Sequence, residues 1–173
     1  GIIAGRQIVS AERVEILALT LEGEIDDGLP AMETVSAVLA ARGVPVLAWA
    51  PGKWMFRRAK VVRALLGKFG PRQLLLGDTS LRPLGWPAPS AMRDPSRRVL
   101  AGSDPPPLAG EEVRAGTYGV RLSGEFDPRR PVTSLRRLLT DPATPIQRIG
   151  RRDTPWRAAG RLLRHHRRKQ GPR

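Results

Sequence analysis

The chain has no cysteine and only two histidines. Without cysteine, disulfides, thiol nucleophiles and thiolate metal ligands are excluded. The histidines, His165 and His166, are adjacent in a basic segment near the C-terminus, and adjacent residues on a helix do not share a face. A histidine-rich metal centre is therefore excluded. So is a Ser-His-Asp triad, which would need a histidine in the body of the chain.

Long apolar runs are also missing. No run approaches the roughly 20 residues that span a bilayer, and residues 1–16 lack the basic segment and long apolar stretch of a signal peptide. We expect no transmembrane segment, and the absence of cysteine favours a cytoplasmic protein. No Gly-x-Gly-x-x-Gly or Gly-Lys-Ser/Thr pattern follows a predicted strand, so no nucleotide cofactor is expected.

Acidic residues are scarce. Thirty Lys and Arg stand against 16 Asp and Glu, which gives a formal net charge of +14. Residues 147–173 hold ten of the basic residues and a single acid, Asp153. With 173 residues, 40% of them hydrophobic, the chain is long enough for one domain with a core. We therefore predict an α/β domain at 1–146 and a basic tail at 147–173, which can form a short amphipathic helix.

Apolar runs alternate with amphipathic stretches through the first two thirds of the chain. Strands are predicted at 13–20, 44–50, 72–80 and 97–104, with helices at 30–43 and 54–70. The strands are apolar throughout rather than alternating, as in parallel sheets that are covered on both faces. The order predicts parallel strands joined by helical crossovers. The alternative, that some runs are buried helix segments, is opposed by their short length and flanking Gly and Pro.

The character of the chain changes after residue 104. Pro, Gly and charged residues become frequent, with one possible strand at 118–122 and a short helix at 131–141. A linker at 143–155 then leads to a possible basic amphipathic helix at 156–169.

Two predicted strands end in a glycine followed by polar residues, in "LLLGDTS" and "VLAGSD". In parallel α/β folds, ligands bind at the carboxyl ends of the strands. Asp78 and Asp104, which lie at these ends, are therefore candidate catalytic residues, because a carboxylate there acts as a base or binds a metal. The alternative is that each Asp only begins a turn by accepting hydrogen bonds from backbone amides.

Four further residues are predicted at the same edge as ligand-binding groups: Lys53, Arg82, Ser103 and Glu22. Carboxylates near a Lys and an Arg suit a phosphate or carboxylate substrate. The alternative is that the charged groups among them are solvated loop residues. A site made of Asp and Glu oxygens alone could hold Mg or Mn, with Asp104 as a ligand, although the spacing here is not diagnostic.

The tail "GRLLRHHRRKQGPR" is a second candidate site. Clustered arginines bind phosphates by releasing counterions, largely regardless of base sequence. The predicted contacts to nucleic acid or another polyanion are Arg161, Arg164, Arg167, Arg168 and Lys169. Two alternatives stay open: an anionic membrane that takes up Trp156 and the leucines, or a disordered solubilising terminus. Aromatic residues are few, so a base-stacking platform is not expected in the tail.

Three short stretches within roughly residues 1–104, the last of which extends to Pro106, resemble the PHP family, the polymerase and histidinol phosphatase type of metal-dependent phosphoesterase. "GRQIVSAERVEILALT" is similar to the segment in which a Gly-x-Glu-x motif precedes a strand. "RGVPVLAWAP" is similar to the strand that ends in Ala-His-Pro, and "VLAGSDPP" to the strand that ends in Gly-Ser-Asp-x-His. The family has distorted (β/α) barrels, so the resemblance implies the C-terminal part of a TIM-barrel-like or partial (β/α) barrel.

The chain departs from the PHP motifs at the metal ligands. Gln7 stands where the family has a metal-binding Glu, Trp49 interrupts the Ala-His-Pro position, and Pro106 replaces the last His. Only Asp104 matches a family ligand. The resemblance therefore implies a divergent phosphoesterase-like domain with a lost or reduced metal site that binds an anionic, phosphate-type ligand. Any hydrolysis would use Mg or Mn.

A second function stands beside this one: a non-catalytic protein that binds nucleic acid or another polyanion through its Arg-rich tail. The strand count bears on assembly, because four or five strands are too few for a closed barrel of eight. An unpaired sheet edge invites pairing with another chain. We therefore expect a homo-oligomer or a part of a longer protein.

Overall fold

The computed structural model describes residues 2–50 and 52–170, and residues 168–170 through their backbone only. A five-stranded sheet has the order β1 (Gly5–Val9), β2 (Glu15–Leu19), β3 (Val44–Ala48), β4 (Leu75–Thr79) and β5 (Val99–Gly102). A separate antiparallel pair consists of β6 (Tyr118–Leu122) and β7 (Ile146–Gly150). The helices are α1 (Ala31–Ala40), α2 (Arg57–Lys68), α3 (Ser90–Arg93), α4 (Pro131–Thr140) and α5 (Pro155–Gln170), with a 3-10 turn at Glu112–Arg114.

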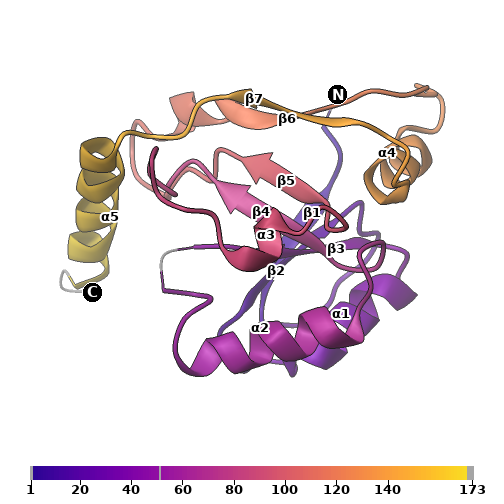
Figure 1. Cartoon of the computed structure of the whole chain (residues 1–173), viewed down its shortest axis with the longest axis horizontal. Helices are drawn as coiled ribbons and strands as arrows, with labels where there is room; N and C mark the ends of the chain where they lie inside the picture. The colour runs from indigo at the N-terminus through magenta and orange to yellow at the C-terminus, as the bar shows by residue number, and fades with distance from the viewer. Residues whose placement is uncertain (1, 51, 171–173) are drawn as a thin grey trace.

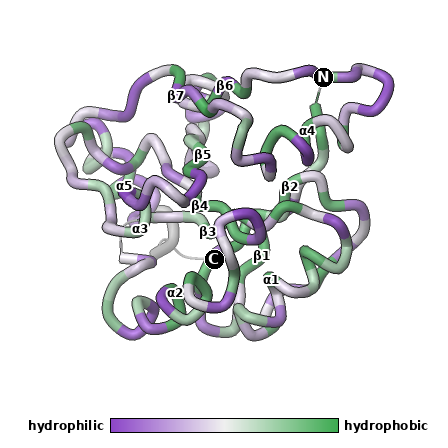
Figure 2. The backbone as a smooth tube through the Cα atoms, turned by 45° about the vertical axis from the view of Figure 1, so that its right-hand side comes forward, coloured by the Kyte–Doolittle hydropathy of each residue, from purple (hydrophilic) through white to green (hydrophobic). Residues whose placement is uncertain are grey.

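The sheet is covered on both faces, but by different kinds of layer. α1 and α2 lie along one face, whereas β6, β7 and α4 cross the other (Figure 1). Val35 and Leu65 from the two helices pack with Leu47 and Leu76 of the sheet. Leu139 of α4 belongs to the apolar cluster on the opposite face. Figure 2 shows hydrophobic colour along the central strands and hydrophilic stretches toward the outer segments.

The predicted parallel, barrel-like fold is wrong. β1 pairs antiparallel with β2, and β2 pairs antiparallel with β3. Only β3–β4 and β4–β5 are parallel. The sheet is open, with β1 and β5 at its two edges, and no closed barrel forms within residues 2–50 and 52–170.

The direction of β2 depends on the acidic segment 20–30. This segment runs back along the sheet, because the Gly28 amide donates to the Val9 carbonyl at 2.9 Å. α1 therefore begins near the end at which β2 began, where the Ala31 amide donates to the Glu12 carboxylate at 2.9 Å. α1 then crosses the sheet, and β3 starts beside the end of β2 and runs in the opposite direction. A prediction based on alternating elements takes such a segment for an ordinary loop.

Two strands were missed in the sequence. β1 lies at 5–9, and β7 lies inside the predicted linker at 143–155 and extends into the predicted basic tail. β7 has no clear apolar face, because four of its five residues are exposed. It ends at Gly150, whose φ is 78° and where an added Cβ would lie 1.9 Å from the Thr117 carbonyl oxygen. Only glycine fits at this point, where β7 leaves β6.

Two arginines are used to hold helices rather than to bind a partner. The Arg97 guanidinium donates to the carbonyls of Leu66 and Phe69, at the end of α2. Arg98 donates to the carbonyls of Leu138 and Leu139 at the end of α4, and burial lowers the pKa of its guanidinium. Unpaired carbonyls at a helix end attract cations. Part of the positive charge therefore belongs to the fold.

None of the helices in the part of the chain that the structure describes has both the length and the apolar character needed to cross a bilayer.

Candidate functional site

A cavity of about 420 Å³ lies between the five-stranded sheet and the layer formed by β6 and α4. We call it the sheet pocket. Its floor includes Ala48, Gly77 and Leu100, which are opposite one another in the strand register. A Cβ on Gly77 would lie 3.3 Å from Val46 Cγ1 and 3.4 Å from Ala48 Cα. A side chain at this position would be tight against Val46, and the small residues Ala48 and Gly77 leave space above the floor of the pocket.

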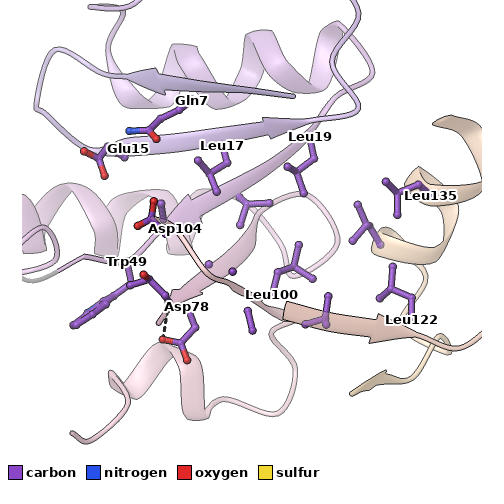
Figure 3. A pocket seen from close by; sticks show the side chains of 18 residues that line it. Gln7, Glu15, Leu17, Leu19, Trp49, Asp78, Leu100, Asp104, Leu122 and Leu135 are labelled. Carbon is purple, nitrogen blue, oxygen red and sulfur yellow. Dashed lines mark hydrogen bonds between the residues drawn. The ribbon is translucent and has the colours of Figure 1, made fainter. Parts of the chain in front are cut away.

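One end of the sheet pocket is polar. Gln7, Glu15 and Asp104 lie together there, whereas leucines line the other end (Figure 3). Glu15 reaches this edge because β2 is antiparallel to β3, so the start of β2 lies beside the carboxyl end of β3. Lys53, in the turn after β3, binds the Glu15 carboxylate with Nζ 2.6 Å from Oε1. This cation is therefore already paired with a carboxylate.

Asp104 lies at the polar end with a left-handed backbone, φ 42°. Aspartate adopts this conformation more readily than most residues. Its side chain is accessible, yet the pocket walls displace part of its water. This burial and the nearby Glu15 charge raise the pKa of the Asp104 carboxyl, against smaller lowering effects from Thr79, Arg161 and His165. Asp104 therefore holds a proton more readily than an ordinary aspartate, as a candidate proton donor or acceptor should.

Asp78, the second predicted catalytic residue, is tightly bound. Arg82 grips its carboxylate at two points, with Nε 2.7 Å from Oδ1 and Nη2 2.6 Å from Oδ2. The Tyr118 hydroxyl and the Thr79 amide also donate to it, each at 3.0 Å. Burial and the Asp78 charge raise the pKa of Tyr118. Asp78 and Arg82 are almost fully buried, so this arrangement holds β4 and β6 together and leaves neither charge open to a ligand.

Ser103 and Glu22 do not face the polar end of the pocket. Ser103 is buried, its hydroxyl accepts a hydrogen bond from the Gly116 amide at 3.1 Å, and its carbonyl accepts one from the Ser80 hydroxyl at 2.6 Å. Glu22 is exposed beyond the end of β2. Because β2 is antiparallel to β3, Glu22 lies near the amino end of β3, whereas Asp104 and Lys53 lie at the carboxyl ends of the parallel strands. The structure thus brings Glu15 to the place where Glu22 was expected.

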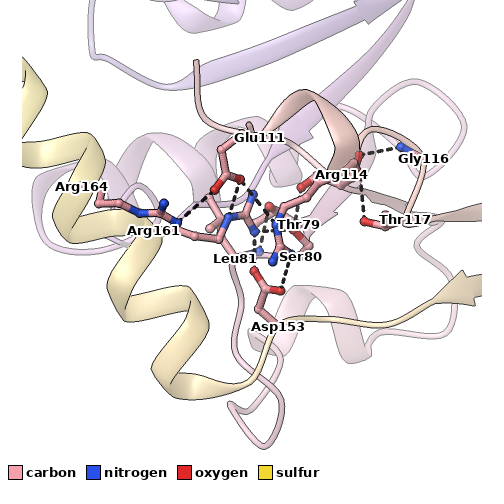
Figure 4. Close-up of polar contacts among 11 residues, drawn as sticks. Thr79, Ser80, Leu81, Glu111, Arg114, Gly116, Thr117, Asp153, Arg161 and Arg164 are labelled. Carbon is pink, nitrogen blue, oxygen red and sulfur yellow. Dashed lines mark hydrogen bonds and ion pairs between the residues drawn. The ribbon is translucent and has the colours of Figure 1, made fainter. Parts of the chain in front are cut away.

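Arg161 of α5 is buried in a polar cluster, with only 1% of its surface exposed. Its Nε lies 2.7 Å from Glu111 Oε2, and its Nη1 donates to the Ser80 hydroxyl at 3.2 Å and to the Asp153 carboxylate. Arg114 adds a second contact to Asp153, with Nη1 2.9 Å from Oδ1. Figure 4 shows these side chains converging beside the end of β4. The cluster fastens α5 to the body of the protein.

The outward side of α5 forms an open depression of about 660 Å³. We call its exposed or half-exposed side chains the α5 arginine surface: Arg114, Trp156, Arg157, Leu163, Arg164 and Arg167. Trp156 is 86% exposed and Leu163 is 58% exposed. Of the five tail residues predicted to contact a polyanion, Arg164 and Arg167 lie on this surface, and Arg161 lies beneath it. The side chains of Arg168 and Lys169 lie outside the described residues.

The donor set of the sheet pocket does not fit a divalent metal. Among the residues that the structure describes, no group of three or more His, Asp or Glu side chains gathers as a metal site would require. Glu15 is bound to Lys53 and Asp78 to Arg82, so two of the three carboxylates near the edge are already paired with cations. Asp104 is left as the one described carboxylate there without an ion pair, and Mg or Mn would need most of its octahedral shell from water or a bound phosphate.

No protein-family model matches the chain, and a comparison with the curated proteins finds no match either. The resemblance to the PHP family therefore stays a prediction that rests on three short stretches, while the barrel that it implied is not found.

Two parts of the candidate sites were missed in the sequence. Glu15 looked like an interior strand residue, and only the strand direction brings it to Asp104. Glu111 and Asp153 are distant in sequence from each other and from Ser80, and the contacts of Arg161 join them. A single acid among ten basic residues was the one available signal for Asp153, since an isolated acid among arginines is an expected ion-pair partner.

Proposed function

We propose that the chain binds polyanions, nucleic acid in particular, through the α5 arginine surface. The observation that carries this proposal is the state of Arg157 and Arg167. Both are exposed on the same depression, and neither has a carboxylate within ion-pair distance among the described residues. By contrast, the cations of the sheet edge, Lys53 and Arg82, are bound to carboxylates. Unpaired guanidiniums attract phosphates and release counterions on binding.

The chemistry of this surface favours phosphate groups along a chain. Guanidinium forms two parallel hydrogen bonds to a phosphate, which a lysine ammonium does not. Most of the residues that line the depression are arginines, and the exposed Trp156 offers one aromatic face for a base or sugar. The net charge of +14 steers any polyanion toward the protein.

The test is fluorescence anisotropy with a labelled short DNA duplex over a salt series. Binding should weaken linearly on a log–log plot against salt, with a slope set by the number of phosphates contacted. Arg157→Ala and Arg167→Ala should each reduce the magnitude of this slope by about 1. The matched control is Arg63→Ala on α2, an exposed arginine of the opposite layer, which should leave the slope unchanged.

Two outcomes would overturn the proposal. The first is a slope that is the same for wild type, Arg157→Ala and Arg167→Ala. The second is binding to anionic phospholipid vesicles with none to the duplex, which would assign the surface and its Trp156 to a membrane. Deleting α5 is not a clean test, because Arg161 is a buried partner of Glu111 and Asp153. Point variants on the exposed side separate binding from folding.

The proposal includes a cytoplasmic location, which the lack of cysteine favours. It also includes self-association or membership of a longer chain. The outer edge of β1 has no strand beside it among the described residues, which is the kind of edge that pairs with another chain. The PHP-like phosphoesterase is the less supported function, because the described residues gather no metal donor set there and Lys53, Arg82 and Arg161 are each paired with a carboxylate.

A further inference from the structure

We infer that the sheet pocket binds a small molecule with an apolar body and a primary ammonium group. The pocket is separate from the α5 arginine surface, and its walls and polar end are unlike those of an anion site. Three features carry the inference: the apolar lining, the acceptors gathered at one end, and the pairing of the nearby cations.

The apolar body is accommodated by the inner part of the pocket. Leucines line it from three elements: Leu17 and Leu19 from β2, Leu122 from β6, and Leu135 and Leu139 from α4. Leu17 and Leu135 are only half-buried, so apolar surface stays accessible inside the pocket. A volume of about 420 Å³ falls in the range of small-molecule sites. A hydrocarbon body that enters would remove this leucine surface from water, which is favourable.

The head group is selected by the polar end. Gln7, Glu15 and Asp104 come from β1, β2 and the segment after β5, and all three line the same end of the pocket (Figure 3). Each offers a carbonyl or carboxylate oxygen as an acceptor. Lys53 occupies Oε1 of Glu15, so the acceptors that remain are Oε2 of Glu15, the Asp104 carboxylate and the Gln7 amide oxygen. An ammonium group has three N–H donors and no acceptor, so it matches these three acceptors. A cation placed there would also relieve the repulsion between the Glu15 and Asp104 carboxylates, which lie close enough to perturb each other.

An anionic head is disfavoured at the same place. The Lys53 ammonium is bound to Glu15, and the Arg82 guanidinium is held by Asp78 and the Trp86 carbonyl. Arg161, whose charge also acts on Asp104, is paired with Glu111 and Asp153. A carboxylate or phosphate would therefore face the Glu15 and Asp104 carboxylates, while Lys53, Arg82 and Arg161 are each paired with a carboxylate of the protein. This reverses the charge preference that the presence of Lys53 and Arg82 suggested from the sequence.

The test is isothermal titration calorimetry with three probes that differ only in the head group: hexylamine, hexanol and hexanoate. Because the protein carries a net charge of +14, the titrations are run at about 0.15 M salt, where exposed charges farther than about 8 Å away are largely screened. Hexylamine should bind at least about tenfold more tightly than hexanol, as charge-assisted hydrogen bonds outweigh neutral ones. Hexanoate should bind most weakly.

Variants locate the binding. Asp104→Asn should weaken hexylamine binding about tenfold and leave hexanol unchanged. Glu22→Gln, at the opposite edge of the sheet, is the matched acidic control and should change neither. Leu17→Phe fills the pocket without altering charge and should weaken both ligands. Binding of the DNA duplex should be the same in all three variants, which shows that each is folded and keeps this test distinct from that of the α5 arginine surface.

Three results would overturn the inference. They are no heat of binding with hexylamine, equal or tighter binding of hexanoate, and hexylamine binding that Asp104→Asn and Leu17→Phe leave unchanged. The last result would place the amine elsewhere on the protein.

Discussion

Replacing Arg161 with methionine removes a buried positive charge while keeping most of the volume of the side chain. The change leaves Glu111 and Asp153, 3% and 7% exposed, without their closest cation. Removing one partner of a buried ion pair costs about 3–5 kcal/mol, because the remaining charge stays buried. Arg114 still lies 2.9 Å from Asp153, and Arg164 lies 3.4 Å from Glu111. We therefore expect the lower end, a loss of about 3 kcal/mol in the free energy of unfolding.

The assay is urea unfolding of wild type and Arg161→Met at neutral pH, with linear extrapolation to zero urea. Arg157→Met is the matched control on the same helix, because Arg157 is exposed, and it should lie within about 0.5 kcal/mol of wild type. Adding Glu111→Gln and Asp153→Asn to Arg161→Met should restore part of the loss, since the unpaired charges are then gone. A change below about 0.5 kcal/mol in Arg161→Met would refute the idea that this cluster fastens α5 to the body.

Two further predictions concern the carboxylates of the sheet edge. Asp78→Asn should lower the free energy of unfolding by about 3–5 kcal/mol in a urea melt, because the buried Arg82 loses its counterion; full stability would contradict the structural role of the pair. The raised pKa of Asp104 means that the folded state holds the proton more tightly than the unfolded state. Stability from this group should therefore rise as pH falls through the folded pKa toward the unfolded one. Asp104→Asn should abolish that increment and change stability at neutral pH by less than about 1 kcal/mol, since solvent screens an accessible carboxyl; melting curves over a pH series that match wild type would contradict this.

Much of the secondary structure could be predicted from local patterns. The strands at 44–48, 75–79 and 99–102 lie within predicted strands and do run parallel. Their apolar residues are continuous because both faces of the sheet are covered. The helix that begins at Ala31 follows a proline and precedes Gly43, both of which are local signals.

The direction of β2 could not be predicted in the same way. It depends on whether segment 20–30 connects forward or runs back along the sheet, and this is decided by hydrogen bonds to residues 9–12, well before it in the chain. The wrong direction for β2 also led to a wrong set of site residues. It placed Glu22 at the polar end of the pocket and left out Glu15, which the antiparallel direction brings there.

The role of each arginine was equally beyond a sequence prediction. Composition shows an excess of positive charge, but it does not show which guanidiniums are already paired with carboxylates or carbonyls of the protein. Arg82, Arg98 and Arg161 are bound inside the fold, whereas Arg157 and Arg167 are exposed. The difference depends on tertiary contacts such as the one that joins Arg161 to Glu111, 50 positions away.

The two histidines lie on α5, with His165 half-buried and His166 exposed.

The anchoring of α5 by Arg161 also determines how the exposed arginines meet a partner. A disordered basic tail would lose about 1–2 kcal/mol of backbone conformational entropy for every residue ordered on binding. On a helix that is already formed, Arg157 and Arg167 are separated by ten residues, or about 15 Å along the axis. The helix therefore fixes the distance between the two arginines. A stiff duplex whose phosphates match this spacing is distinguished from a flexible polyanion by geometry as well as by charge.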